Sequence, residues 1–565
     1  MMKIQVFALG GLGENGKNLY VIDVEERLFV FDAGMKYPSR ELFGIDEIIP
    51  DFRVLVQKKD QIEGIFMSHA HNEHIGAIAH LLKEIDVPVY ATNFTMQLIK
   101  DTLKEHGLNP DDYKLKTVPE YAMIKFGNVK VSFFKTTHSI PESVGFALQT
   151  LAGTIVYTSN FSFDQVADVR YQTDFNKLTE IAESKTLLLM TESLGSQDIY
   201  DGNKREMFDH LVNEAIFTAT DRVIISLYSS DLMQIQKIVN IALKYDKRVA
   251  IIGRKAQRIV DIAIENNYLS IPDDKLVYLK FIDEKTKNDD PDLVCLVTGD
   301  RHEPYYMLQR MLRKADNLIH INENDTIIVA TAPISGTERI AAKTINLLYR
   351  SNAKINVIDK EYLTGNNATA DEIKMLINML KPKYIMPVIG EYSKMYKVLN
   401  IAKTMGYDES RVFLLDNGDL LRFDDEERVF VQKGRYRNGD VLIDGLGLGD
   451  INDIVLHDRE LLSEDGVLIC IAHVDPLAKE ISGEVELITK GFLTESDIKM
   501  VEEEIKNIFI SRINAYLETS KYVNWNEIKY TLRDEINKYL FKELRRRPVT
   551  IPVLISVEDN GNDQA

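Results

Sequence analysis

A cluster of three histidines and one carboxylate constrains the fold of this chain more than any other feature. The segment Ser68-His69-Ala70-His71-Asn72-Glu73-His74 directly follows an apolar run typical of a buried strand and precedes a helix-like stretch at 75–85. Imidazole nitrogens and carboxylate oxygens both suit zinc, and a sharp turn after the strand brings such residues together. The segment therefore predicts a present or ancestral metal site. His80, His106 and His210 stand alone in the sequence, and we expect them to be structural or solvated.

The apolar runs divide the chain into three kinds of region. Over the first 200 residues, short apolar runs end in small or polar residues, and such strand ends are where α/β sheets usually place their chemistry. A more regular strand–helix alternation at 201–354 indicates an inserted parallel sheet with crossover helices. Beyond residue 450 we expect strands and two amphipathic helices, the second starting at Asn524 with Glu527 placed for a capping box and ending before Pro548.

Composition restricts the compartment and the partners. The chain has 68 basic and 87 acidic residues, a net charge of −19, which argues against attraction of the whole surface to nucleic acid but leaves room for a local basic channel. Cys295 and Cys470 are too few for a disulfide framework, which favours a reducing compartment. We find no signal-peptide pattern and no long uncharged apolar run. We therefore expect a cytoplasmic protein without membrane association.

Further motifs occur with the histidine cluster in a fixed order. Asp32 precedes the cluster, and after it come the segment 136–143 around His138, Thr191-Glu192-Ser193, the segment 333–336 and the segment 387–392. Together with the cluster they resemble the ribonuclease J family of metallo-β-lactamase/β-CASP ribonucleases over essentially the whole chain. The resemblance implies an α/β protein with a metallo-β-lactamase αββα sandwich at 1–200 and 355–450 and a β-CASP α/β domain inserted at 201–354. It also implies a small α/β C-terminal domain for dimerisation or assembly at 451–560, before a disordered tail at 561–565.

The resemblance also implies a two-zinc site, several ligands of which are replaced in this chain. Asn160 stands where the family has an aspartate that bridges both ions, and Ile389 stands where it has a histidine. A neutral amide cannot offset the repulsion between two dications, and isoleucine has no lone pair. Glu73 keeps the charge of the usual aspartate but is one methylene longer. We expect at most one zinc ion, with manganese as a substitute. The expected metal ligands are His69, His71, Glu73, His74 and His138.

Motifs on the substrate side differ from the family pattern as well. At 229–234 the chain has Met233 and Gln234 in place of a histidine and an arginine, and at 364–368 it has asparagine in place of a histidine in a phosphate-contacting loop. Asparagine can donate a hydrogen bond to phosphate but cannot serve as a proton donor in catalysis. Glu73 and Glu192 are the remaining candidates for catalytic roles. The expected substrate-binding residues are Ser230, Asp231, Leu232, Leu363, Thr364, Gly365, Asn366 and Asn367.

The pattern of replacements resembles a ribonuclease J paralogue with a degenerate active site, found in Gram-positive bacteria beside an active one. One hypothesis is a metal-dependent ribonuclease with weak residual activity in rRNA processing and mRNA decay, which also acts as partner of the active paralogue. The alternative is a fully inactive subunit that only positions RNA. We expect RNA, a homodimer or hetero-oligomer, and an RNA-degradation complex as partners. A β-lactamase or small-ester hydrolase is excluded, because the inserted domain has no role there.

Overall fold

The computed structural model describes the chain except residues 1–2, 39–43, 165–167, 199–201, 280–289, 335, 364–366, 425–427, 446, 449–452, 476–477, 479, 494, 520–523 and 557–565. The chain forms two compact units, one of residues 1–39 with 46–446 and one of residues 40–45 with 447–565. We treat each unit by itself. The expected domain boundaries near residues 200, 355 and 450 remain a prediction, and the expected tail lies outside the described residues.

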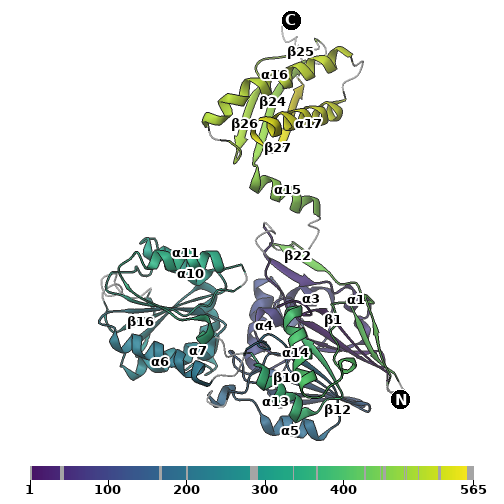
Figure 1. The fold of residues 1–565 in the computed structure, drawn as a ribbon, viewed down its shortest axis with the longest axis vertical. Coiled ribbons are helices and arrows are strands. Elements are labelled where there is room, and N and C mark those ends of the chain that lie inside the picture. Colours follow the sequence, from purple (N-terminus) through teal and green to yellow (C-terminus); the bar gives the residue numbers. More distant parts are fainter. Residues whose placement is uncertain are drawn as a thin grey trace. The chain divides into compact units, whose positions relative to one another are not determined.

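Two sheets packed face to face form the centre of the first unit (Figure 1). The first sheet has the order β21-β20-β1-β2-β3-β5-β6-β7 and the second the order β19-β12-β11-β10-β9-β8. The strands of the first are β1 (Ile4–Gly10), β2 (Leu19–Val24), β3 (Arg27–Phe31), β5 (Ile62–Phe66), β6 (Val89–Ala91), β7 (Leu115–Thr117), β20 (Leu420–Phe423) and β21 (Val429–Gln432). Those of the second are β8 (Met123–Phe126), β9 (Val129–Lys135), β10 (Val144–Thr150), β11 (Gly153–Tyr157), β12 (Thr186–Glu192) and β19 (Tyr384–Val388).

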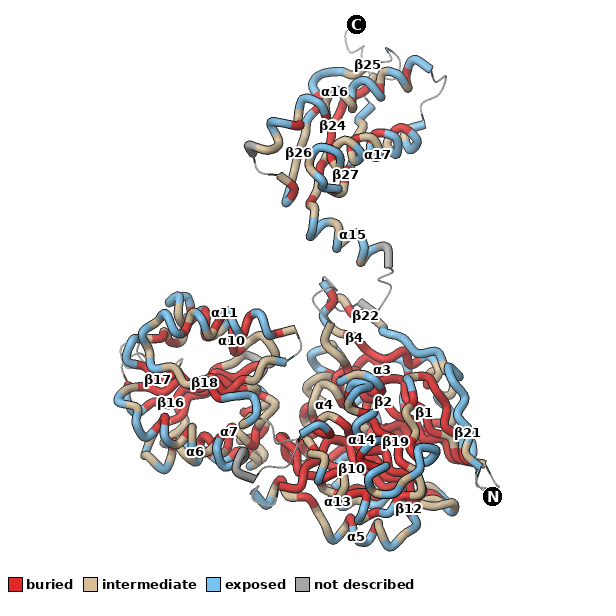
Figure 2. The backbone as a smooth tube through the Cα atoms, viewed as in Figure 1, coloured by how far each residue is buried: buried red, intermediate tan, exposed pale blue. Residues whose placement is uncertain are grey.

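Aromatic side chains fill much of the core of this sandwich. They reach it because alternate residues of each strand face the opposite sheet. Phe66 lies with its ring centroid 5.5 Å from Phe31 and 6.2 Å from Phe146, and all three side chains are buried. Figure 2 shows that strands such as β1, β2 and β19 are buried along most of their length. Outer layers of helices pack on the two sheets, which confirms the predicted αββα arrangement. They include α3 (Ile78–Glu84) and α4 (Asn93–Glu105) on the first sheet, and α5 (Phe175–Glu183), α13 (Ala370–Leu380) and α14 (Tyr392–Thr404) on the second.

An all-parallel sheet forms the core of the inserted domain, in the order β15-β14-β16-β13-β17-β18. Figure 1 shows α6 and α7 below this sheet and α10 and α11 above it, so its central strands are buried on both faces. The strands are β13 (Val223–Tyr228), β14 (Arg248–Ile252), β15 (Leu276–Val277), β16 (Leu293–Gly299), β17 (Thr326–Val329) and β18 (Lys354–Val357). The helices include α6 (Gly202–Thr218), α7 (Leu232–Lys244), α8 (Arg254–Glu265), α10 (Glu303–Leu312) and α11 (Glu338–Leu348).

The second unit is a small α/β domain. In its sheet β24 (Val467–Asp475) pairs with β25 (Glu480–Ile481), β26 (Glu486–Lys490) and β27 (Val549–Ser556). Two long helices, α16 (Glu495–Thr519) and α17 (Trp525–Leu544), pack on one face of it, and α15 (Asp453–Glu464) precedes the first strand. The side chain of Asn524 caps α17 by accepting from the backbone N–H of Glu527, so the predicted start of this helix is confirmed. The expected capping box is not completed, because the backbone N–H of Asn524 donates to the hydroxyl of Tyr516 and not to Glu527. Among the described residues, no helix is long and apolar enough to span a membrane.

Candidate metal centre

Three histidine rings converge at the point where β5 ends and the short helix α2 (Asn72–Ile75) begins. The Nε2 atom of His69 and the Nε2 atom of His138 each lie 3.2 Å from Nδ1 of His71. Zinc–nitrogen bonds of about 2.0–2.1 Å in a tetrahedral site place the ligand nitrogens about 3.3 Å apart. The observed spacing therefore fits three ligands of one ion with an open fourth position.

The surroundings of the rings orient them for this role. The Nε2 atom of His71 lies 3.1 Å from the carbonyl oxygen of Ser230, which can only accept, so Nε2 carries the proton and Nδ1 presents its lone pair to the other two rings. The hydroxyl groups of Ser68 and Ser159 lie 3.1 and 3.3 Å from Nδ1 of His69. Such contacts to the second ring nitrogen are typical of metal-binding histidines.

Burial disfavours the charged form of His69 and His71. It lowers the pKa of His69 well below its ordinary value, and the neighbouring rings lower it further. Burial also lowers the pKa of His71, which the nearby Glu73 partly offsets. Neutral imidazole is the form that binds metal ions. The three-histidine site of His69, His71 and His138 thus fits one zinc ion in geometry, and the lowered pKa values of His69 and His71 favour their metal-binding form.

His74 is held away from a ligand role by two neighbours. Its Nδ1 lies 2.7 Å from Oδ2 of the buried Asp32, so this nitrogen donates, and its Nε2 accepts from the amide of Asn18 at 3.2 Å. The carbonyl oxygen of that amide accepts from the hydroxyl of Tyr20 at 3.0 Å, which fixes its orientation. The only lone pair of His74 is therefore already engaged. Glu73 is half-buried and interacts electrostatically with Tyr37 and Arg301.

The two replaced positions supply no ligand in place of those expected. The amide nitrogen of Asn160 donates to Oε2 of Glu192 at 2.9 Å and to Oδ1 of Asn367 at 3.1 Å. Ile389 is buried in the sandwich core, with a φ of 51° that β-branched residues rarely adopt. The residues present do not fit a second ion beside the first.

Glu192 at the end of β12 connects three segments of the chain. Its Oε1 accepts from the backbone N–H groups of Phe161 at 2.7 Å and Ala368 at 3.0 Å, and its Oε2 accepts from Asn160. The side chain is fully buried, and burial raises its pKa to about 8 although these donors oppose the shift. These contacts assign Glu192 to holding the loops around the site together.

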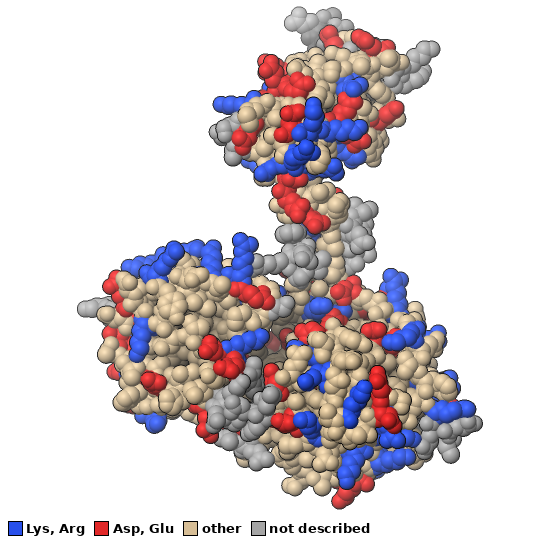
Figure 3. Space-filling view, viewed as in Figure 1, with Lys and Arg blue, Asp and Glu red and all other residues tan. Residues whose placement is uncertain are grey.

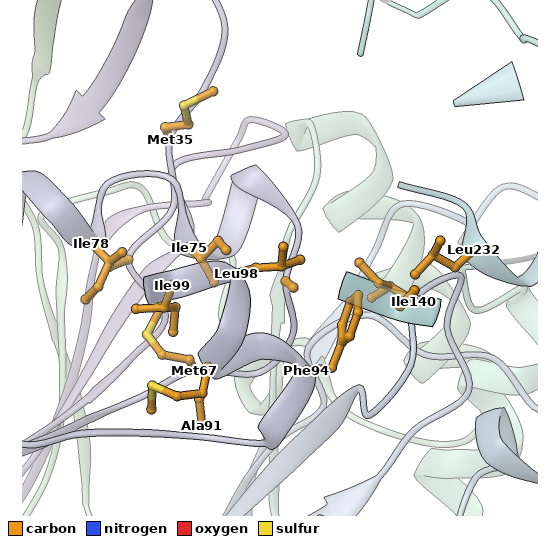
Figure 4. Packing of buried hydrophobic residues seen from close by; sticks show 14 of the residues in the cluster. Met35, Met67, Ile75, Ile78, Ala91, Phe94, Leu98, Ile99, Ile140 and Leu232 are labelled. Carbon is orange, nitrogen blue, oxygen red and sulfur yellow. The ribbon is translucent and has the colours of Figure 1, made fainter. Parts of the chain in front are cut away.

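The expected substrate-binding residues lie in several different settings. Ser230 contacts His71 through its carbonyl oxygen, and the Asp231 side chain caps α7 by accepting from the backbone N–H of Gln234. Leu232 is fully buried in the apolar cluster that also contains Phe94 and Ile140 (Figure 4). Leu363 is half-buried, and Asn367 contacts Asn160. Thr364, Gly365 and Asn366 lie outside the described residues. A role of these residues in substrate binding stays a prediction.

Two residues at the site were not anticipated from the sequence. Asn18 lies far from the histidine cluster in the chain, and no local pattern marks it. Ser159 carried a signal, because it stands where the family motif has glycine, and its φ of 52° explains the preference for glycine there. Its hydroxyl nevertheless donates to Ser68 at 2.8 Å and so supports His69.

The fold and the site define a metallo-β-lactamase protein with a β-CASP insertion. Residues 12–141 match the metallo-beta-lactamase superfamily, residues 220–348 match "Ribonuclease J, beta-CASP domain", and residues 454–557 match "Ribonuclease J C-terminal domain". Among solved structures, a protein of unknown function from Enterococcus faecalis V583 shares the fold, with a TM-score of 0.50 at 14% identity. That likeness covers 74% of this chain and 100% of the other.

Curated relatives extend the match over the whole chain. "Ribonuclease J2" of Bacillus subtilis is 34% identical over 554 residues, which is 98% of this chain and 99% of the relative. "Ribonuclease J 2" of Staphylococcus aureus is 34% identical over 560 residues, which is 98% of each chain. The chain therefore belongs to the ribonuclease J family, whose members act in RNA processing and decay.

Proposed function

We propose that this chain binds RNA in RNA processing and mRNA decay as the partner of an active ribonuclease J paralogue, with weak phosphodiesterase activity of its own. The proposal rests on the difference between the residues that can bind the first metal ion and those at the positions expected to bind the second. Three imidazoles converge within hydrogen-bonding distance, whereas the amide of Asn160 is engaged with Glu192 and Asn367. A site that fits one ion supports residual hydrolysis and not the full two-ion reaction.

The chain's own residues have separate tasks in this proposal. His69, His71 and His138 would hold one zinc or manganese ion, which when bound supplies a Lewis acid and an activated water. The Ser230 carbonyl fixes the tautomer of His71 and so joins the inserted domain to the three-histidine site. Glu192 and Asn160 hold the surrounding loops and take no part in proton transfer.

A local basic surface supports RNA as the ligand despite the net charge of −19. Figure 3 shows Lys and Arg side chains gathered over α10 and α11 of the inserted domain. Cations grouped in this way bind phosphate oxygens without reading the base sequence. The exposed residues of this surface include Arg313, Lys314, Arg339, Lys343 and Arg350.

Assembly through the second unit is supported by the sheet face that its helices leave uncovered. On β24, residues such as Leu468 and Cys470 point to α16 and α17, so Ile469 points to the other face. There Ile469 lies in register with Ile488 on one side and Ile551 on the other, and the latter two are 42% and 43% exposed. An exposed apolar row of this kind marks a protein interface. We propose that it packs against the same domain of a second copy or of the paralogue.

RNA binding and turnover test the proposal directly. A labelled 5′-monophosphorylated RNA is mixed with the chain alone, with the active paralogue, and with both. We expect slow degradation by the chain alone, lost in the variant His69→Ala with His138→Ala, and faster degradation by the mixture than by the paralogue alone. Turnover by the isolated chain at the rate of the paralogue, or no effect on the paralogue, would overturn the proposal.

Charge reversal separates RNA binding from catalysis. Arg339→Glu with Lys343→Glu should weaken RNA binding and lower the dependence of log K on log salt by about 2, since each lost phosphate contact lowers it by about 1. Lys397→Glu with Lys403→Glu on α14 is the matched control, with the same charge change on another exposed helix. Equal losses in both variants would show that overall charge, and not this surface, governs binding.

Substitutions in the exposed row separate assembly from stability. Ile488→Asp with Ile551→Asp should abolish association with the paralogue in light scattering, while unfolding of the domain changes little because both side chains are partly exposed. Met500→Asp on α16, where the side chain is 70% exposed, is the matched control and should associate normally. Unchanged association of the double variant would refute this surface as the interface.

A further inference from the structure

A second cluster of potential metal ligands lies apart from the three-histidine site. It consists of Glu47, His80 and His106, whose ligand atoms all lie within 4.8 Å of one another. Glu47 begins β4 (Glu47–Pro50), His80 lies on α3, and His106 follows the last residue of α4. No local pattern in the sequence marks this group, since three separate elements contribute one residue each.

The polar atoms of this cluster lack hydrogen-bond partners within the part of the chain that is described. Both ring nitrogens of His80, Nδ1 of His106 and Oε2 of Glu47 are buried without one. A buried polar group left unpaired costs about 1–3 kcal/mol, so a chain rarely leaves several together. His80 itself is 1% exposed. These atoms therefore point to a ligand that can accept several lone pairs at once.

The geometry of the cluster suits a cation better than a direct ion pair. Nε2 of His80 lies 3.5 Å from Oε2 of Glu47, which is long for a charge-assisted hydrogen bond but near the separation of about 3.3 Å between two ligands of one tetrahedral zinc ion. The rings of His80 and His106 meet edge to face, with centroids 4.7 Å apart and planes at 76°. Stacked rings would turn their nitrogens away from a common point.

We propose that Glu47, His80 and His106 bind a zinc ion that stabilises the first unit. Two imidazoles and one carboxylate are a ligand set that zinc accepts, with water in the fourth position. The 26% exposure of the Glu47 side chain leaves access for that water. Nearby charges act in opposite directions, because Lys83 disfavours and Glu105 favours a cation beside His106. The proposal departs from the expectation of at most one zinc ion per chain, because the chain would then hold one ion at each of the two sites.

The ion would join elements that the hydrophobic core connects only in part. Strand β4 lies outside both large sheets and pairs with β22 (Asp440–Asp444), whereas α3 and α4 cover the first sheet of the sandwich. A cross-link from Glu47 to both helices fastens this small sheet to the sandwich. Bound metal should therefore raise the unfolding temperature of the first unit by mass action.

Metal content and thermal stability of the full chain test the site. The background is the variant His69→Ala with His138→Ala, which removes the three-histidine site. After removal of metal and dialysis against zinc, this background should retain one ion per chain. Adding Glu47→Gln or His106→Gln should reduce that to none, whereas adding His210→Gln, a 70% exposed histidine, should change nothing.

Two further readouts protect the test against simple misfolding. Glu47 and His106 are only partly buried, so they carry the test in place of the buried His80, and circular dichroism checks that each variant is folded. Cobalt added to the background should give the visible absorption of a tetrahedral ion, and zinc should raise its Tm. Unchanged zinc content, cobalt absorption and Tm response in folded Glu47→Gln and His106→Gln variants would overturn the proposal.

Discussion

Replacement of Glu192 by glutamine tests the environment assigned to this buried carboxyl group. Burial raises its pKa to about 8 from an ordinary value of 4.5. In the unfolded chain the group ionises near 4.5, so between these two values the folded chain binds more protons than the unfolded chain. The contribution of Glu192 to stability is therefore complete below 4.5 and decreases as the pH rises to about 8.

The size of this decrease follows from the interval between the two values. About 3.5 pH units separate 4.5 from about 8, and at ~1.36 kcal/mol for each unit the decrease is about 5 kcal/mol. Glutamine has the same shape, keeps an oxygen that accepts from the N–H groups of Phe161 and Ala368, and has no proton to lose. The stability of Glu192→Gln relative to the unchanged chain should therefore rise from about pH 5 and level off above about pH 8.

Chemical unfolding of both metal-free proteins at a series of pH values measures this difference. Trp525 is the single tryptophan and lies on α17, so its fluorescence follows the second unit and should give equal midpoints for both proteins. Circular dichroism follows both units and should show the pH-dependent difference. A stability difference between the two proteins that does not change with pH would mean that the three N–H donors keep Glu192 ionised. That result would contradict the raised pKa of this group.

Three other predictions follow from the same structure. The double change Asn160→Asp with Ile389→His should raise metal-dependent exonuclease activity on 5′-monophosphorylated RNA. Either single change leaves the second ion short of ligands and should do little. If a folded double variant binds two ions and is no faster, residues other than Asn160 and Ile389 limit the activity. Burial raises the pKa of the Cys295 and Cys470 thiols to about 12. Neither thiol should therefore react with iodoacetamide near neutral pH until the chain unfolds. Modification of the native chain, detected by mass spectrometry, would contradict their burial. Removal of residues 451–565 should leave a folded first unit that no longer associates with the paralogue in light scattering, and association as tight as that of the full chain would exclude an assembly role for the second unit.

The sequence predicts the pairing of His69 with His71 from local information, whereas His138 comes from a distant segment and is assigned by the family resemblance. His69 and His71 follow one strand directly, and a turn of fixed geometry after a buried strand brings them together. The short apolar runs with polar ends predict strands, whereas the sandwich that these strands form follows from the resemblance of the motifs to the ribonuclease J family. The replacements at 160 and 389 are equally visible, because each falls within a recognisable motif.

Tertiary contacts explain what the sequence does not predict. The amide of Asn18 engages His74 only because β2 lies beside β3, the strand that leads to Asp32. Glu47, His80 and His106 come together through packing of one strand and two helices, and each looks solitary in the sequence. The cap that the Asp231 side chain forms on α7 is a local contact that the residue type permits, and the substrate-binding role of Asp231 stays a prediction.

Elemental analysis of zinc in the variant His106→Gln measures the capacity of the three-histidine site, because this variant lacks the proposed site at Glu47. We expect one zinc ion per chain in this variant, none after the further change of His69 and His138 to alanine, and two after addition of Asn160→Asp with Ile389→His. The opposite result is two zinc ions per chain in His106→Gln with Asn160 and Ile389 unchanged, both of which are lost when His69 and His138 are also changed. It would contradict a three-histidine site that holds one ion.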